Sequence, residues 1–199
     1  NFGHLEGVKT VQKIVEASIF FKIPIVTFYV FSSENWKRPK SEVNYLFNLI
    51  KIYFKKEIGN IIKNKIKINI LGRKNNLPQE IKKTLVSAVK KTKNNNKLTV
   101  NLAINYGSKN EIIDSVKKTF LISKKINETN LSDNLYLNLP FPDILIRTGG
   151  QKRLSNFMLW QLAYTEIFFL DKLWPDFSKM DLSKIIKKYN KIQRNYGGI

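Results

Sequence analysis

Two polar segments of the chain carry side chains that could bind a charged substrate. Residues 32–38 offer two hydroxyls, a carboxylate, an amide, an indole and a guanidinium. Residues 147–156 place Arg147 and Arg153 on either side of a Gly-Gly pair, with a hydroxyl at Ser155. Guanidinium forks, backbone amides and hydroxyls are typical ligands of phosphate and diphosphate groups. The alternatives are a polar turn in the first segment and an ordinary Gly-Gly turn with surface arginines in the second.

Three further side chains stand out singly. Trp36 lies in a polar segment although a large aromatic ring normally seeks burial, which indicates a lid over an apolar ligand. His4 precedes the first apolar stripe and is either incidental or a ligand. Glu166 opens an apolar run, where a carboxylate needs a partner: either a structural ion pair or a magnesium ion whose other ligands are substrate phosphates.

The composition excludes several classes of protein. The chain has 199 residues, 43% of them apolar and 25% charged, which is typical of a globular protein. It has no cysteine, so a disulfide scaffold, a thiolate zinc site and a cysteine nucleophile are excluded, and its one histidine excludes a His-rich metal centre. No stretch approaches the about 18 apolar residues that a membrane span needs.

The net charge of +20 points first to nucleic acid, but the distribution of the charge argues against it. Lysines occur along the whole chain rather than in one block, as expected of solvated helix faces. Lysine, isoleucine and asparagine are all abundant, which indicates a coding bias. The rare arginines are more informative because the planar fork of arginine is hard to replace; they are Arg38, Arg73, Arg147, Arg153 and Arg194.

Hydrophobic periodicity predicts an α/β fold with a mostly parallel central sheet flanked by helices, in a single domain over residues 1–199. The expected strands are residues 25–31, 65–71, 98–104, 143–147 and 166–170, and amphipathic helices separate them. One of these helices should begin with a capping box of Ser108 and Glu111. Ligands of open parallel sheets bind beyond the carboxyl ends of the strands, where the polar segments lie.

Seven motifs, in order along the chain, resemble those of the cis-prenyltransferase family, in particular the bacterial undecaprenyl diphosphate synthases (isoprenyl transferases). They are Gly3-His-x-x-Gly7, Phe31-Ser-Ser-Glu-Asn-Trp-x-Arg-Pro39, Ile146-Arg-Thr-Gly-Gly150, Arg153-Leu-Ser-Asn-Phe157, Leu159-Trp-Gln-Leu-Ala-Tyr164, Leu173-Trp-Pro-Asp-Phe177 and Arg194-x-Tyr-Gly-Gly198. The resemblance runs from residue 2 to residue 198. Seven ordered motifs make a chance similarity implausible.

The resemblance implies a fold, a reaction and partners. The fold would be a parallel sheet wrapped by helices around a hydrophobic tunnel, in a homodimer. The reaction would be Mg²⁺-dependent elongation of farnesyl diphosphate by isopentenyl diphosphate with cis geometry. The product would be a polyprenyl diphosphate, undecaprenyl diphosphate, which carries cell-wall polysaccharide. We expect a cytoplasmic protein that contacts the inner face of the membrane transiently on product release and binds no specific nucleic acid.

The resemblance also assigns roles to individual residues. Asn35 occupies the position of the proton acceptor; since a neutral amide is a poor base, we expect it to orient a water molecule or a diphosphate oxygen that takes the proton. Glu166 would contribute to the Mg²⁺ site, and Arg194 lies in a tail motif that reaches toward the partner subunit's site. The substrate-binding residues would be His4, Ser32, Ser33, Glu34, Trp36, Arg38, Arg147, Arg153, Leu154, Ser155 and Arg194.

Two departures from the family pattern matter. The family's Met-Asp-Gly-Asn-Gly-Arg-Trp strand, with an aspartate that carries magnesium, would precede Asn1, so we expect an N-terminally incomplete domain that does not condense substrates alone. Gln151 stands where a carboxylate is common. Two alternatives remain open: a non-catalytic prenyltransferase-like subunit, which would typically lack the arginine pair, and a basic RNA-binding α/β domain, which would need a concentrated basic stripe or exposed strand aromatics.

Overall fold

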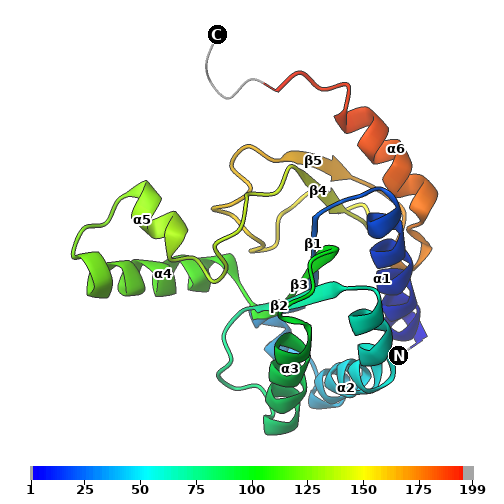
Figure 1. The fold of residues 1–199 in the computed structure, drawn as a ribbon, viewed down its shortest axis with the longest axis horizontal. Helices are drawn as coiled ribbons and strands as arrows, with labels where there is room; N and C mark the ends of the chain where they lie inside the picture. Colours follow the sequence, from blue (N-terminus) through cyan, green and yellow to red (C-terminus); the bar gives the residue numbers. More distant parts are fainter. Residues whose placement is uncertain (1, 195–199) are drawn as a thin grey trace.

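Helices and strands alternate along most of the chain, as the hydrophobic pattern predicts (Figure 1). The computed structural model describes residues 2–194. The elements are α1 (Phe2–Phe20), β1 (Ile25–Ser32), the 3₁₀ helix η1 (Ser33–Lys37), α2 (Lys40–Lys63), β2 (Ile66–Leu71), α3 (Gln79–Thr92), β3 (Leu98–Tyr106), α4 (Ser108–Ser123), α5 (Glu128–Asp133), β4 (Ile144–Arg147), β5 (Glu166–Phe169), the 3₁₀ helix η2 (Trp174–Asp176) and α6 (Lys179–Tyr189).

All strand pairs of the described residues are parallel, but they form two sheets rather than one. The larger sheet has the order β1-β3-β2, so β3 is its central strand. The smaller sheet pairs β4 with β5, with Ile144 opposite Glu166 and Arg147 opposite Phe169. The predicted α/β class with parallel strands is confirmed, and the five predicted strands are all present.

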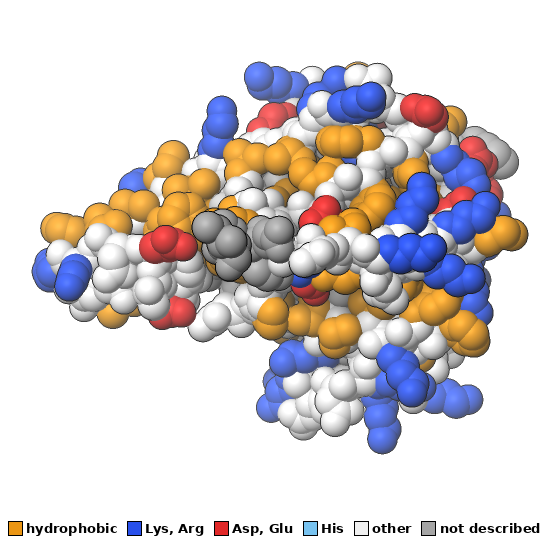
Figure 2. Space-filling model, turned by 90° about the horizontal axis from the view of Figure 1, so that it is seen from above, with side chains coloured by type: hydrophobic (Ala, Val, Ile, Leu, Met, Phe, Trp, Pro, Cys, Tyr) orange, Lys and Arg blue, Asp and Glu red, His pale blue; other side chains and the backbone are white. Residues whose placement is uncertain are grey.

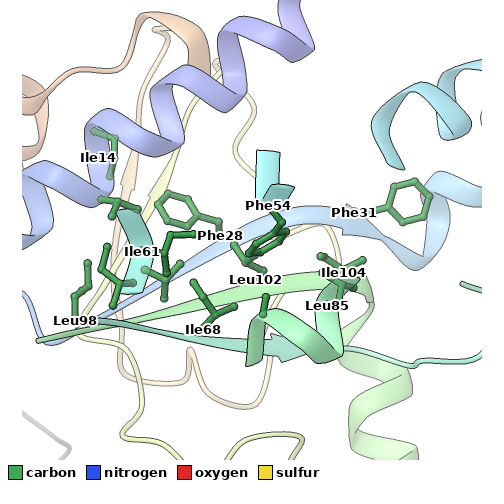
Figure 3. Packing of buried hydrophobic residues seen from close by; sticks show 14 of the residues in the cluster. Ile14, Phe28, Phe31, Phe54, Ile61, Ile68, Leu85, Leu98, Leu102 and Ile104 are labelled. Atoms are coloured by element: carbon green, nitrogen blue, oxygen red, sulfur yellow. The ribbon is translucent and has the colours of Figure 1, made fainter. Parts of the chain in front are cut away.

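The hydrophobic core surrounds β3, which is buried along almost its whole length. Apolar side chains of α1, α2 and α3 pack against the larger sheet (Figure 3). Ile14 of α1 and Phe54 of α2 lie over β1 and β3, where Phe28 pairs with Leu102. Helices α4 and α5 extend away from this core as an arm (Figure 1). The buried parallel strands explain why their sequences are apolar on both faces.

The predicted capping box at the start of α4 does not form. The helix begins at Ser108, but its N-cap is Gly107 and no side chain caps it. Glu111 is instead fully buried, and its carboxylate accepts hydrogen bonds from the Tyr106 hydroxyl and from Gln161 Nε2 at 3.0 Å. The Glu111 side chain therefore points inward and accepts hydrogen bonds from buried donors. Leaving those donors unpaired would cost more stability than an exposed helix cap contributes.

We predict that Phe31→Ala destabilises the fold by about 3–5 kcal/mol. The Phe31 ring is 1% exposed and lies 5.1 Å from the ring centroid of Trp36 and 5.0 Å from that of Phe47, so its loss leaves a cavity. Urea unfolding followed by circular dichroism measures the effect. Phe141, which is 46% exposed, gives the matched control, since Phe141→Ala should change stability by about 0.5 kcal/mol or less. Equal losses in the two variants would contradict this account of the core.

Candidate active site

Three polar segments meet at the carboxyl end of the larger sheet. Strand β1 leads into η1, β3 leads into Gly107, and the loop after β4 returns to the same place. A Cβ atom on Gly107 would overlap the Ser33 hydroxyl and lie 2.7 Å from Asn156 Nδ2. Both side chains fill the space beside this glycine, and Asn156 Nδ2 donates to Glu34 Oε1 at 2.7 Å, so the two polar segments singled out in the sequence lie against each other, as the strand-end argument predicts.

The arginines of the second segment are held by neutral partners. Arg147 Nη1 donates to Ser155 Oγ at 2.9 Å, and Arg153 Nη1 donates to Gln151 Oε1 at 2.7 Å. No helix begins at Ser155, which has a left-handed φ of 48°. The arginine-rich loop is therefore a tight irregular turn whose side chains converge.

The backbone amides of the Gly-Gly pair are already engaged. Gly149 N donates to Lys172 O and Gly150 N donates to Leu170 O, both at 2.9 Å. Both glycines have positive φ, 86° and 73°, which favours glycine at these positions. The expectation that these amides are free to bind phosphate is therefore wrong: they bind the segment after β5.

The electrostatics of the arginine pair favour an anion. Burial lowers the pKa of Arg147, and the nearby charge of Arg153 lowers it further. Neither guanidinium has a carboxylate partner within residues 2–194, and Arg147 Nε is buried without a hydrogen-bond partner. Two unneutralised guanidinium groups with an unused donor could hold a phosphate or diphosphate.

The first segment holds an ionised carboxylate at its centre. Burial tends to raise the pKa of Glu34, but hydrogen bonds from Asn156, its own backbone N–H and Ser33 outweigh burial and lower it. Asn156 Nδ2 donates to Glu34 Oε1 at 2.7 Å, and Ser33 Oγ donates to Glu34 Oε2 at 3.1 Å. Asn35 Oδ1 accepts from Ser32 N at 2.9 Å. The segment is thus ordered by its own polar side chains.

Trp36 is anchored in the fold and is not a free lid. Its Nε1 donates to Asn105 Oδ1 at 2.8 Å, and its ring packs against Phe31 and Phe47. Asn105 Nδ2 in turn donates to the carbonyl oxygens of Arg73 and Asn75, both at 2.9 Å. The ring that the sequence suggested as a lid over an apolar ligand therefore packs against the hydrophobic core, and its hydrogen bond to Asn105 holds it there.

His4 and Arg38 converge on Glu42. His4 Nε2 lies 3.3 Å from Glu42 Oε1, and Arg38 Nη1 donates to the same oxygen at 2.8 Å. A cavity of about 450 Å³ is lined by His4, Pro39, Ser41 and Glu42. Sequence analysis missed Glu42, although its position four residues after Arg38 in the first turn of α2 is a usable signal for an ion pair.

Glu166 and Arg194 lie away from the arginine pair. Glu166 is opposite Ile144 at the start of the strand pair, three residues, or about 10 Å, from the level of Arg147. Arg194 forms an ion pair with Asp143 at 2.7 Å, and Glu166 N donates to Asp143 O at 3.0 Å. The rest of the terminal motif lies outside the described residues. Within residues 2–194 no group of three His, Asp or Glu side chains could hold a metal ion.

Parallel sheets with an arginine pair near a strand end are typical of α/β proteins that bind phosphorylated ligands. The family model described as "Putative undecaprenyl diphosphate synthase" matches residues 1–197. The chain belongs to this family of prenyltransferases and is a transferase of prenyl groups. Both the recognition of the family from its motifs and the predicted cis-prenyltransferase fold are thereby confirmed.

Individual relatives support the assignment. An isoprenyl transferase of Fusobacterium nucleatum is 44% identical over 200 residues, covering 100% of this chain and 87% of the relative. A probable undecaprenyl diphosphate synthase from Campylobacter jejuni has a TM-score of 0.91 at 37% identity, covering 97% of this chain and 92% of that structure. Lavandulyl diphosphate synthase from Lavandula x intermedia, in complex with dimethylallyl diphosphate, has a TM-score of 0.93 at 28% identity, covering 98% and 88%.

We predict that Asn105→Ala destabilises the protein by about 3 kcal/mol, because three neutral hydrogen bonds of about 1 kcal/mol each are lost or left unpaired. Asn105 also has a φ of 51°, where alanine is strained. Asn105→Gly should lose the same bonds but cost about 1 kcal/mol less, since glycine accepts this φ. Urea unfolding of the two variants measures the difference. An alanine variant as stable as the glycine variant would rule out the strain.

Proposed function

We propose that the protein elongates an allylic diphosphate, farnesyl diphosphate, with isopentenyl diphosphate in cis geometry. The product is a polyprenyl diphosphate, undecaprenyl diphosphate, which carries cell-wall polysaccharide. The observation that carries the proposal is the unneutralised pair of Arg147 and Arg153 beside Ser155. The relatives named isoprenyl transferase and undecaprenyl diphosphate synthase support the transfer of isoprenyl groups and this product.

The isopentenyl diphosphate is bound by the arginine loop. Arg147, Arg153 and Ser155 hold its diphosphate, and Leu154 lies between them along the chain. In each cycle the carbon–oxygen bond of the allylic diphosphate breaks, its C1 bonds to the isopentenyl double bond, and one proton leaves. Negative charge grows on the departing diphosphate, so positioned donors at that diphosphate stabilise the transition state.

The allylic diphosphate is bound by the η1 side. Ser32, Ser33, Glu34, Trp36 and Arg38 line this side in our proposal, with His4 next to Arg38 through Glu42. Asn35 already accepts a hydrogen bond at its oxygen, so its NH₂ group is the part that it can offer to a ligand. We infer that this NH₂ group orients a diphosphate oxygen, which takes the proton.

We propose that the reaction uses Mg²⁺, but that Mg²⁺ is not held beside Arg147 by the described residues alone. When bound, Mg²⁺ supplies positive charge to the diphosphate groups. The described residues do not gather a magnesium site at Arg147, because Glu166 lies at the other end of the strand pair. Glu166 N and Arg194 both contact Asp143 at that end. As the resemblance implies, we infer that Glu166 would contribute to the Mg²⁺ site and that Arg194 reaches toward the partner subunit's site.

The homodimer is proposed from the exposed apolar surface of the arm. Phe120, Leu121 and Ile122 at the end of α4 are 50%, 74% and 66% exposed, and Ile126 follows them at 50%. Hydrophobic side chains gather along this arm in Figure 2. An apolar cluster of this kind marks a protein contact more often than a solvated surface. The hydrophobic tunnel expected from the family stays a prediction.

Contact with a membrane surface is proposed from charge. No helix of the described residues is long and apolar enough to cross a bilayer. A cavity of about 780 Å³ between β5 and α6 is lined by apolar side chains, Phe168 and Ile185 among them, and by five lysines against two aspartates, one of which, Asp181, pairs with Lys172. Clustered lysines near apolar surface suit anionic lipid headgroups. Together with the family resemblance, we infer from this cluster a cytoplasmic protein with transient contact at the inner face of the membrane; that it binds no specific nucleic acid stays a prediction.

We predict that Arg147→Lys and Arg153→Lys each weaken binding of isopentenyl diphosphate by about 1–3 kcal/mol, which is roughly 5- to 150-fold in Kd. Lysine keeps the charge but loses the planar fork. Isothermal titration calorimetry with isopentenyl diphosphate measures the change. Arg73→Lys is the matched control, since Arg73 binds Asp114 and not the arginine loop.

Unchanged affinity in both loop variants would overturn the substrate assignment. These 199 residues do not include the family's Met-Asp-Gly-Asn-Gly-Arg-Trp motif. Product length is therefore measured by reversed-phase chromatography in a protein that also carries that motif, incubated with farnesyl and isopentenyl diphosphates.

We predict that Leu121→Asp weakens the homodimer about 100-fold or more. Each leucine buried in an interface contributes about 1.5–3 kcal/mol, and a symmetric dimer contains two. Light scattering after size-exclusion chromatography over a dilution series measures the dissociation. Val86→Asp, at a site 54% exposed on α3, should leave the dimer intact. A monomeric parent protein at high concentration would refute the homodimer.

A further inference from the structure

Asn156 is bound on three sides by two different parts of the site. Its Nδ2 donates to Glu34 Oε1 at 2.7 Å, which reaches η1. Its Oδ1 accepts from Lys109 N at 2.9 Å, and its backbone oxygen accepts from Ser108 N at 2.8 Å, both in the first turn of α4. Asn156 also follows Ser155 directly in the arginine loop. The side chain of Asn156 thus joins the loop that carries Arg147 and Arg153 to η1.

The chemistry of these contacts requires an amide. The backbone N–H of Lys109 can only donate a hydrogen bond, so the oxygen of the Asn156 amide must face it. The nitrogen then faces Glu34, whose lowered pKa keeps it an ionised acceptor. Aspartate would keep the contact with Lys109 but would place a second negative charge against Glu34. Asn156 also has a φ of 61°, a left-handed value that asparagine tolerates better than most residues.

Gly107 provides the space in which this contact forms. The position of its missing Cβ is bounded by the Ser33 hydroxyl on one side and by Asn156 Nδ2, at 2.7 Å, on the other. Both side chains therefore lie in the space beside Gly107 that a larger residue would occupy. The separation of the two loops is therefore set by a short chain of contacts, from Ser155 through Asn156 to Glu34.

We propose that Asn156 is a positioning residue that couples the two diphosphate subsites, so that each substrate tightens the binding of the other. The inference rests on the proposed function, which assigns the arginine loop to isopentenyl diphosphate and η1 to the allylic diphosphate. A diphosphate that orders Arg147 and Ser155 orders Asn156, and through it Glu34 and Ser33. Binding on the other side then requires less ordering.

The coupling is measured by calorimetry on a protein that contains these 199 residues and also carries the family's Met-Asp-Gly-Asn-Gly-Arg-Trp motif; this is the parent protein for the variants below. The probes are isopentenyl diphosphate and farnesyl thiodiphosphate, in which sulfur replaces the bridging oxygen and blocks the reaction. We expect each probe to bind alone and to tighten the other about fivefold or more in the parent protein. Asn156→Asp should reduce this factor to about one, while each probe still binds by itself. Asn138→Asp, an exposed site, is the charge-matched control and should keep the coupling.

Exchanging the amide and the carboxylate between positions 156 and 34 distinguishes a specific loss of coupling from a general loss of structure. In a chain with both Asn156→Asp and Glu34→Gln, the new amide can donate to the new carboxylate, so the hydrogen bond re-forms with its direction reversed. We expect the coupling factor to recover in this double variant. Glu34→Gln alone keeps an acceptor oxygen for Asn156 and should keep most of the coupling.

Each outcome decides between the claims. Failure of the parent protein to bind either probe overturns the proposed function itself. Binding of both probes without coupling, coupling that survives Asn156→Asp, or a loss that the double variant does not repair overturns the role of Asn156 alone. If Asn156→Asp does not fold, as judged by its melting temperature, Asn156→Gly removes both side-chain hydrogen bonds while accepting the positive φ, and retained coupling in that variant overturns the inference.

Discussion

The site depends on the burial of β3 between two parallel neighbours. Since β1 and β2 pair with β3 on both sides, its end at Tyr106 is fixed, and Gly107 follows at a defined point. The polar loops then approach this point as closely as the backbone allows. Asn105, just before it, holds Trp36 in the same framework. Packing in the sheet thereby determines the positions of the charged side chains in the two polar loops, although these side chains are not part of the hydrophobic core.

The sequence predicts the elements well because their signal is local. Apolar runs such as residues 98–104 show burial directly, and polar residues after such runs mark the strand ends. The division into two sheets could not be predicted, because strand pairing depends on neighbours far away in the chain. Register has the same difficulty: only the pairing of Ile144 with Glu166 shows that this carboxylate lies away from Arg147.

Apart from the local pair of Arg38 and Glu42, the contacts that sequence reasoning missed cross long sequence distances. Glu111 suggested a helix cap by spacing, but it accepts from Gln161, fifty residues later. Asn156 was part of a motif without a role of its own, and its contact with Glu34 spans 122 residues. One prediction from composition agrees with the structure, namely that the rare arginines are more informative than the abundant lysines. The lysines are mostly exposed, whereas Arg147 is partly buried and lacks a carboxylate partner in residues 2–194.

The helix α4 connects two regions of the molecule that have separate chemistry. Its first turn holds Asn156, and its last turns carry Phe120 and Leu121. Sixteen residues make a rod of about 24 Å, too stiff to absorb a displacement at either end. In the proposed homodimer, subunit concentration and ligand occupancy would therefore be linked: dissociation at the end of α4 would lower the affinity for ligand at its first turn, and saturation with ligand would make the dimer harder to dissociate.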